Sequence, residues 1–459
     1  MNLTKTRQII LYFLYSFLFL LPWQTRLIYS ESSFFSGRLL EYGRSSLYAT
    51  ELILWVVILG VGLPIIFSRR SWAQVLEKIN LSKNFSRLII LISIFLLLAF
   101  YLFLSPFPDI SYNTIFRVLE GLCLIVIVHE LTLTQSENRR ALYAFWLGGV
   151  GQGLLAIWQF FSQSVMASKW LGLAAHSAAN LGDFVIETGA VGISSAAVGG
   201  VERWLRAYGA FPSPNILGAF LATAFLVGVI LTLHVKTVRE RLGLAVGQIF
   251  ISAGLFFSFS RSAWVGLIAG LVYLGIIIWR RQNSPEVVKY QKIAWRWNLF
   301  ILGATALLLA TIYSPLITTR LSGSGPLEAR SINDRFSQVS TWTALISATP
   351  RNFLLGAGPG LYTYALRQYN PNFSSWAYDQ VHNTYLLIFA ELGLLGFVLL
   401  FFLSFSIINL IKKQNPLWLA VIAAMLAAAL FDHFWWSLYA GQMLWWGVLA
   451  LGLGRSSAE

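Results

Sequence analysis

The sequence predicts an all-α polytopic membrane protein with about twelve transmembrane helices and a large extracytoplasmic loop that contains short helices. Two observations carry this prediction. Hydrophobic residues make up 57% of the 459 residues and charged residues only 11%, whereas a soluble domain carries about 25% charged residues. Roughly 20 apolar residues cross one bilayer, and stretches of this kind recur along the whole chain. We therefore expect residues 1–459 to form a single integral membrane domain.

The apolar stretches define the expected elements in order. The expected spans are 8–22, 47–68, 88–105, 113–134, 141–162, 213–234, 243–259, 262–279, 297–315, 384–411, 416–431 and 436–453. The first could instead be a signal peptide, because Lys5 and Arg7 precede a short apolar core. No small-residue cleavage site follows it, so a retained span is favoured.

The distribution of basic residues predicts the orientation. Lys and Arg exceed Asp and Glu by 14, and in membrane proteins basic residues collect in cytoplasmic loops. With the N-terminus inside, the two most basic connections, 68–87 and 279–296, lie in the cytoplasm. This reading needs no nucleic-acid partner. It places both termini in the cytoplasm and turns two long segments, 163–212 and 316–382, to the outer face.

The longer of these outer segments has a helical pattern of its own. SINDRFSQVSTWTALI predicts a helix capped by Ser331, with Phe336, Val339 and Leu345 on one apolar face. The glycines and proline of 356–360 would end it.

Arg206, Arg261 and His382 are the outer-face residues most suited to chemistry. Arg206 precedes span six, where Pro212 and Pro214 limit the helix start, and Arg261 lies in the outer turn between spans seven and eight. Arginines at span ends commonly reach out to lipid phosphates, and an interfacial histidine is often structural.

A transferase that works on this face needs a donor that is already activated, such as a lipid diphosphate. Binding a diphosphate requires fixed cations or a metal. The sequence has neither a D-x-D nor an H-E-x-x-H motif. We therefore expect no metal and no cofactor, and assign the electrostatic work to arginines.

His382 directly precedes span ten, with Asn383 as the expected helix cap. A helix N-terminus offers free N–H groups and a positive dipole end to a phosphate. The same field favours a neutral imidazole, which can act as a general base. Glu391, inside span ten, should face the protein interior, where it could serve function or only hold helices together.

Four segments together resemble the O-antigen ligase and O-antigen polymerase superfamily of membrane glycosyltransferases. They are RAYGAFPSPN, FSRSAWVGL, DRFSQVSTWTALISATPRNFLLGAGPGLY and VHNTYLLIFAELGLLG, which cover about residues 203–400 in the family's order. Ser213 departs from the pattern, because many members have histidine before Pro-Asn.

The resemblance implies a C-type membrane glycosyltransferase-like fold and metal-independent, inverting transfer from a polyprenyl-diphosphate-linked oligosaccharide, such as one on undecaprenyl diphosphate. It implies that Arg206 and Arg261 bind the diphosphate and that His382 deprotonates the acceptor hydroxyl. The secondary candidates that would shape the pocket are Asn215, Arg335, Asn383, Tyr385 and Glu391. The implied setting is the bacterial inner (plasma) membrane, in lipopolysaccharide or polysaccharide biosynthesis for the cell envelope, with the active site on the periplasmic or extracellular face.

The acceptor stays open at this point. A lipid A core, a second lipid-linked glycan or a protein hydroxyl would make the protein a ligase, a polymerase or a protein O-oligosaccharyltransferase, and we favour them in that order. A flippase or transporter for lipid-linked saccharide would also want outer-face arginines, but would not need His382. A structural scaffold would leave the long outer loop and Glu391 without a role.

Overall fold

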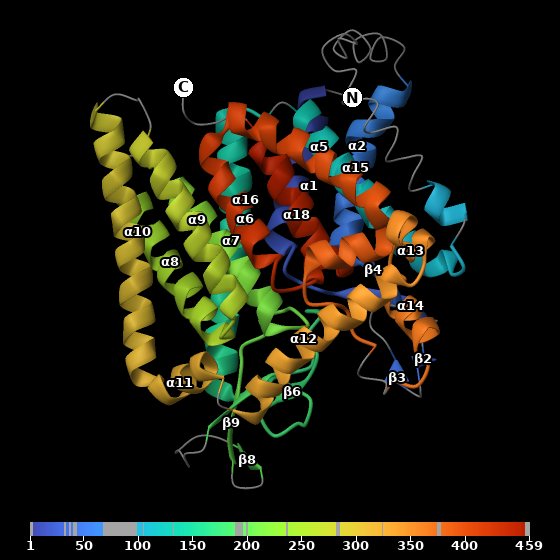
Figure 1. Ribbon diagram of the computed structural model, residues 1–459. Coiled ribbons are helices and arrows are strands. Elements are labelled where there is room, and N and C mark those ends of the chain that lie inside the picture. Colours follow the sequence, from blue (N-terminus) through green and yellow to red (C-terminus); the bar gives the residue numbers. More distant parts are fainter. Residues whose placement is uncertain are drawn as a thin grey trace.

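The computed structural model is a bundle of long helices with small sheets and short helices at one end (Figure 1). The residues that it describes are 3–31, 34–35, 38–39, 44–67, 99–103, 105–131, 133–188, 196–198, 201–235, 237–280, 285–323, 325–373 and 378–454. The helices of the bundle are α1 (Leu3–Leu20), α2 (Ala49–Phe67), α5 (Pro108–Glu130), α6 (Gln135–Ser162), α7 (Pro214–Thr232), α8 (Val238–Ser258), α9 (Arg261–Arg280), α10 (Pro285–Ile312), α15 (Thr384–Gln414), α16 (Leu419–Ala428) and α18 (Tyr439–Gly452).

Seven of the described helices, α5 to α10 and α15, are long and apolar enough to cross a membrane. This agrees with the predicted class of helical, polytopic membrane protein. The count of twelve spans stays a prediction, because α16 and α18 are shorter than a bilayer needs on their own. The third expected span, 88–105, lies largely outside the described residues.

Both ends of the described chain meet the start of α6. Arg7 of α1 donates to the Glu137 carboxylate at 2.8 Å, and Gly454 packs against the side chain of Asn138. Thr134 and Glu137 cap α6 reciprocally, which satisfies two backbone donors of its first turn. We call this the terminal end of the bundle and the opposite end, which carries the sheets, the site end (Figure 1).

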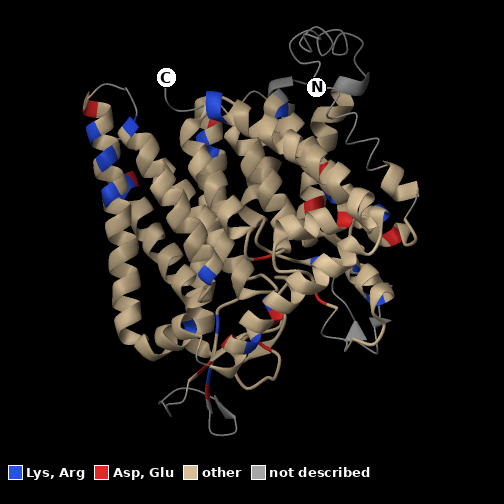
Figure 2. Ribbon diagram, in the orientation of Figure 1, with Lys and Arg blue, Asp and Glu red and all other residues tan. Residues whose placement is uncertain are grey.

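Basic residues gather at both ends of the bundle (Figure 2). At the terminal end the first turns of α10 carry Lys289, Lys292 and Arg296. These residues belong to the connection 279–296, which is predicted to be cytoplasmic because it is basic. The assignment of the two ends to the two sides of a membrane stays a prediction.

Small antiparallel sheets at the site end are a difference from the purely helical expectation. Strands β1 (Arg26–Glu31) and β4 (Arg44–Tyr48) pair with each other, as do β2 (Phe34–Phe35) with β3 (Arg38–Leu39), and β5 (Ser164–Val165) with β6 (His176–Ser177). Strand β9 (Val201–Leu205) lies between β7 (Val185–Thr188) and β8 (Ala196–Val198). These segments are too short and polar to be spans, and hairpin pairing satisfies their backbone groups.

The segment between α10 and α15 is helical, as expected, but its main helix begins earlier than predicted. It comprises α11 (Ser314–Ser322), α12 (Pro326–Ser347), α13 (Pro350–Leu355) and α14 (Tyr362–Tyr369). Ser331 is therefore inside α12 and not its cap, because Pro326 sets the first turn behind Gly325.

The predicted apolar face of α12 is also wrong. Leu345 is buried, but Phe336 is 73% exposed and Val339 is 44% exposed. The expected glycine break falls on a different helix: α12 already ends at Ser347, ahead of Pro350, and Gly356, with a φ of 72° that disfavours a side chain, ends α13.

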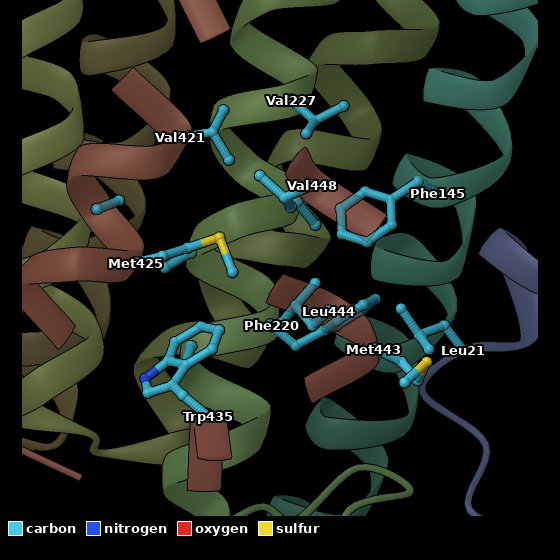
Figure 3. Packing of buried hydrophobic residues seen from close by; sticks show 14 of the residues in the cluster. Leu21, Phe145, Phe220, Val227, Val421, Met425, Trp435, Met443, Leu444 and Val448 are labelled. Carbon is cyan, nitrogen blue, oxygen red and sulfur yellow. The ribbon is translucent and has the colours of Figure 1, made fainter. Parts of the chain in front are cut away.

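Helix α7 forms the centre of the bundle. It is buried along nearly its whole length and packs against α6, α8, α9 and α16. Figure 3 shows Phe220 and Val227 of α7 among Val421 and Met425 of α16 and Leu444 of α18. Helix α7 starts at Pro214, directly after the cap residue Ser213, as the two prolines predicted. The Arg206–Asn215 segment is therefore joined directly to the most buried helix of the bundle.

Candidate functional site

Two glutamines of α6 hold the loop that leads into α7. Gln159 accepts from the amides of Tyr208 and Gly209 at 3.0 and 2.8 Å, and Gln152 accepts from Ala210 at 2.8 Å. Both glutamines are buried, where unpaired backbone amides would be costly. These bonds fix the turn that follows Arg206.

Arg206 is buried behind Asn215. Its Nε donates to the Ser258 carbonyl at 2.9 Å and its Nη2 to Asn215 Oδ1 at 2.7 Å; the residue is 4% exposed. Burial lowers the pKa of Arg206, and the nearby Arg320 lowers it further, although an arginine in a protein keeps its proton. The predicted diphosphate ligand is thus a buried charge that orients Asn215.

Asn215 continues the chain of hydrogen bonds to a segment far away in the sequence. Its Nδ2 donates to Asp432 Oδ2 at 3.0 Å. Asp432 is itself buried and accepts at its backbone carbonyl from Thr384 Oγ1 at 2.7 Å. The start of α7 and the start of α15 therefore meet at Asp432.

A cavity of about 170 Å³ lies at the starts of α7 and α9. Its lining residues are Asn215, Arg261, Ser262, Val265, Arg320, Arg335 and Phe431. The structure thus brings together three predicted residues, Asn215, Arg261 and Arg335. It adds Arg320, which sequence reasoning missed because nothing marks it among the arginines of the outer segment.

Glu328 is the acid that partly balances these arginines. It pairs with Arg320 and lies 3.3 Å from Arg261 Nη2. Arg261 keeps 29% of its side-chain surface exposed, and its Nη1 donates to the Arg320 carbonyl at 3.2 Å. Three arginines line the cavity, and one carboxylate, Glu328, pairs with two of them. The cavity therefore keeps a positive charge, and two helix N-termini add to the field.

His382 is tied to the same helix as Arg335. Its Nδ1 lies 2.8 Å from Gln338 Oε1, and its backbone N–H donates to the same oxygen at 3.2 Å. Arg335 and Gln338 are three residues apart on α12 and so share a face. His382 is half-buried, which leaves part of the ring open to a reactant.

A second histidine lies against the first. The rings of His382 and His433 meet edge to face with centroids 5.2 Å apart, and His433 Nδ1 lies 2.7 Å from Ser437 Oγ. Burial lowers the pKa of His433 to about 4, although the carboxylate of Asp432 opposes the shift. His433 was missed, although the pair Asp432–His433 stands out between two expected spans.

Asn383 caps α15 as predicted, and this cap contradicts the expectation that the N-terminus of α15 binds a phosphate. Its Oδ1 accepts from the amides of Tyr385 and Leu386 at 3.0 and 3.1 Å, and the amide of Thr384 donates to Ala429. The first amides of α15 are therefore occupied and cannot bind a phosphate. The side chain of Asn383 and the carbonyl of Ala429 already satisfy these amides.

Tyr385 and Glu391 lie away from the arginine-lined cavity. Tyr385 donates to the Leu426 carbonyl at 2.8 Å and lines an apolar groove. Glu391 is buried, as predicted, and accepts from the Gly360 amide and Trp436 Nε1, each at 2.7 Å. Neither of these two predicted residues lines the cavity of Arg261, Arg320 and Arg335.

Within the described ranges, no group of three or more His, Cys, Asp or Glu residues has the geometry to hold a metal. Residues 246–401 match the family described as O-antigen ligase. No curated protein matches the chain at a significant level. The matched segment contains Arg261, Arg320, Arg335, Gln338 and His382, whereas Arg206 and His433 lie outside it. The resemblance noted in the sequence is thus confirmed over residues 246–401, which are similar to the O-antigen ligase family.

Proposed function

We propose that this protein transfers a glycan from a polyprenyl-diphosphate carrier to an acceptor hydroxyl at the outer face of the bacterial inner membrane, as an O-antigen ligase would. The observation that carries the proposal is the link through α12. One face of this helix lines the arginine cavity with Arg335 and holds His382 with Gln338. An anion site and a candidate base are thereby kept side by side.

The cavity suits the diphosphate of the donor. Arg261, Arg320 and Arg335 present planar guanidinium groups, which pair with two phosphate oxygens at once. Arg206 supports them from behind by orienting Asn215. Their effect grows as the glycosidic bond breaks, because negative charge then develops on the leaving diphosphate.

The same cavity has an apolar exit for a lipid tail. Val265 lines it and is 44% exposed. Ile268, Val272 and Ile276 continue down the same face of α9 and are each more than 40% exposed. A polyprenyl chain can therefore leave the cavity along α9 while its head stays between the arginines.

His382 is suited to accept the proton of the attacking hydroxyl. Gln338 Oε1 already accepts the backbone N–H of His382, which identifies it as the oxygen and makes His382 Nδ1 the protonated nitrogen. The lone pair of the neutral ring is then on Nε2. The acceptor oxygen bonds to the anomeric carbon, the bond to the diphosphate oxygen breaks with its electron pair, and Nε2 takes the proton. Attack opposite the leaving group inverts the anomeric centre.

His433 assists His382 by remaining neutral. A neutral imidazole beside His382 avoids a second positive charge that would oppose protonation of the base. Asp432 holds it and Asn215 in one hydrogen-bonded chain. We expect His433 to be a positioning residue and His382 to be the catalytic one.

The experiment follows release of polyprenyl diphosphate by purified full-length protein in EDTA, with a polyprenyl-diphosphate oligosaccharide and a panel of lipid A core, lipid-linked glycan and peptide acceptors. Release by the wild type that depends on an acceptor and is abolished in His382→Ala supports the proposal. The productive acceptor then distinguishes ligase, polymerase and protein O-oligosaccharyltransferase.

Two outcomes count against it. Tight donor binding without release, combined with movement of the donor across liposome membranes, would favour the flippase alternative. Activity lost in EDTA and restored by Mg²⁺ or Mn²⁺ would overturn the metal-free mechanism. His129→Ala is a matched control, because this exposed histidine ends α5 away from the site.

A further inference from the structure

A cavity of about 220 Å³ lies between α8 and α10, near the terminal end of the bundle. Most of its lining is apolar, with an arginine and a tyrosine at the helix starts: Ala245, Ile293, Trp297, Ile301, Arg241 and Tyr290. Among the described residues, Arg241 is the one charged side chain that lines it. The cavity shares no lining residue with the arginine cavity of the proposed transferase site.

Arg241 is held in place by the ring of Tyr290. Its guanidinium carbon lies 4.8 Å from the centre of that ring, which is a cation–π contact. The Tyr290 hydroxyl lies 2.6 Å from the Val235 carbonyl and 3.1 Å from the Thr232 carbonyl, so the end of α7 fixes the ring. Arg241 itself donates to the Val235 carbonyl at 3.5 Å. Among the described residues this contact uses one of its five N–H donors, and the others are left for a ligand.

Basic residues outnumber acids at the mouth of this cavity, where the first turns of α10 are rich in cations (Figure 2). Lys289 lies four residues before Ile293 and so shares its face of α10. Glu240 follows Arg239 at the start of α8, but it forms an ion pair with Arg139 of α6 at 3.0 Å. Glu286 is the other acid of these two helix starts. Arg241 and Lys289 against Glu286 leave the mouth with a net positive charge.

The cavity opens onto apolar surface of the bundle. Ile293 and Trp297 line it and are each 54% exposed. On α8, Leu242 and Val246 directly follow two lining residues and are also more than half exposed. Apolar side chains therefore border the opening on both helices. In a membrane such a surface faces acyl chains and not water.

The cavity has the depth of one leaflet. It follows α10 from Tyr290 to Ile301, which at 1.5 Å per residue is roughly 16 Å, about half of a bilayer core of about 30 Å. A phosphate beside Arg241 would therefore lie near the membrane surface, and an acyl chain would reach toward the midplane. The proposed donor has its diphosphate at the opposite end of the bundle, so this cavity does not belong to the donor site.

Helix α10 has fewer protein contacts than the other candidate spans. Only 22% of its most apolar window is buried, the lowest share among the seven described candidates. Gln248 of α8 donates to Asn298 Oδ1 of α10 at 3.0 Å, and Asn298 lines the cavity. Toward the helix starts, the cavity separates the two helices. A ligand there would supply the dispersion contacts that an empty space lacks.

We propose that this cavity binds an anionic glycerophospholipid from the leaflet at the terminal end of the bundle. Arg241 and Lys289 hold its phosphate, and one acyl chain fills the space between α8 and α10. Basic pockets between membrane helices bind anionic head groups in this way. The lipid is a structural ligand that strengthens the attachment of α10 to the bundle. It is not a substrate, and the inference does not depend on the proposed function.

The test uses full-length protein in neutral detergent after removal of lipid, and combines native mass spectrometry with thermal unfolding. Phosphatidylglycerol is the anionic lipid, and phosphatidylcholine with the same acyl chains is its zwitterionic counterpart. Glycerol 3-phosphate supplies the phosphate without the chains. We expect one tightly bound phosphatidylglycerol per chain and a rise in Tm, and neither effect with the other two compounds.

Three variants separate the contributions of charge and space. Arg241→Gln should weaken binding of phosphatidylglycerol about tenfold, because it removes a charge-assisted hydrogen bond to the phosphate. Ala245→Phe keeps the arginine but fills the space of the acyl chain, so it should prevent binding. Arg296→Gln is the matched control and should bind as the wild type does, because the Arg296 guanidinium lies over the Trp279 ring of α9 at 5.8 Å.

Three outcomes would contradict the site. Equal binding of phosphatidylglycerol and phosphatidylcholine, unchanged in Arg241→Gln, would reduce it to nonspecific lipid around the bundle. A rise in Tm with glycerol 3-phosphate as large as that with phosphatidylglycerol would exclude a lipid as the occupant. Normal binding of phosphatidylglycerol by Ala245→Phe would show that the acyl chain does not lie in the cavity.

Discussion

Two arginine-lined pockets of the molecule, the first at the starts of α7 and α9 and the N-terminal one beside α5 and the β1–β4 pair, differ in where their arginines come from. Arg261, Arg320 and Arg335 all lie inside the segment that matches the O-antigen ligase family, whereas Arg26, Arg44 and Arg117 all precede it. In the first group Arg261 and Arg320 form ion pairs with Glu328, whereas Arg117 lies between the rings of Tyr48 and Tyr439. The difference is that the family match covers the arginines of the proposed donor pocket and leaves those of the N-terminal pocket outside the matched segment.

The largest effect should come from His382, which Gln338 of α12 holds beside the first pocket. His382→Ala should lower turnover at least 100-fold, because a positioned general base contributes about 10²–10⁴-fold. Donor binding should be unchanged, since the arginines of the first pocket are intact. Steady-state release of polyprenyl diphosphate measures this, and a variant that keeps more than about a tenth of the activity would exclude a general-base role.

Arg206 tests whether a buried arginine can serve the donor pocket indirectly. Its guanidinium bonds the Ser258 carbonyl and Asn215 in two directions, which the single ammonium of lysine cannot reproduce. Arg206→Lys should therefore reduce kcat/KM about tenfold despite the conserved charge. Near-normal kinetics would mean that only a point charge is needed there.

Gln338 tests the coupling of α12 to the base. Gln338→Glu replaces the amide oxygen bonded to His382 Nδ1 with a carboxylate, which stabilises the protonated ring. The acid limb of the kcat–pH profile should move to higher pH, with a loss of several-fold in kcat at neutral pH. A profile that coincides with that of the wild type would show that Gln338 does not orient the base.

His433 should affect stability more than rate. Its folded-state pKa of about 4 lies below the ordinary value near 6.5. The unfolded chain therefore binds the proton first, and stability falls as the pH drops from about 6.5 to about 4, by up to about 3 kcal/mol. His433→Gln, followed by thermal unfolding in detergent across this range, should remove part of the acid sensitivity; an unchanged pH dependence would assign it to other groups.

The sequence was most informative where the physical signal is local. Apolar stretches predicted the helices of the bundle, the Pro-Ser-Pro run predicted the start of α7, and Asn383 was correctly identified as a cap. The buried position of Glu391 followed from the cost of an acid in a membrane helix. Arg261 was chosen for its place in an outer turn, and Asn215 and Arg335 through the resemblance; all three line one cavity.

What could not be predicted depends on contacts between distant segments. Gln338 is bonded to His382 across 44 residues, and Asp432 to Asn215 across 217. No periodicity or composition reports such proximity, so Arg320, Gln338 and His433 were missed. The sheets at the site end were missed for a related reason, because strands of two to six residues give little local pattern.

The most direct test of the account compares donor binding and turnover in the same preparations of wild type, Arg261→Gln and His382→Ala. We expect Arg261→Gln to weaken binding of polyprenyl diphosphate at least tenfold. His382→Ala should bind it as the wild type does, with less than about a hundredth of the turnover. Normal binding by Arg261→Gln, or substantial turnover by His382→Ala, would contradict the claim that the arginine cavity and His382 form one transferase site.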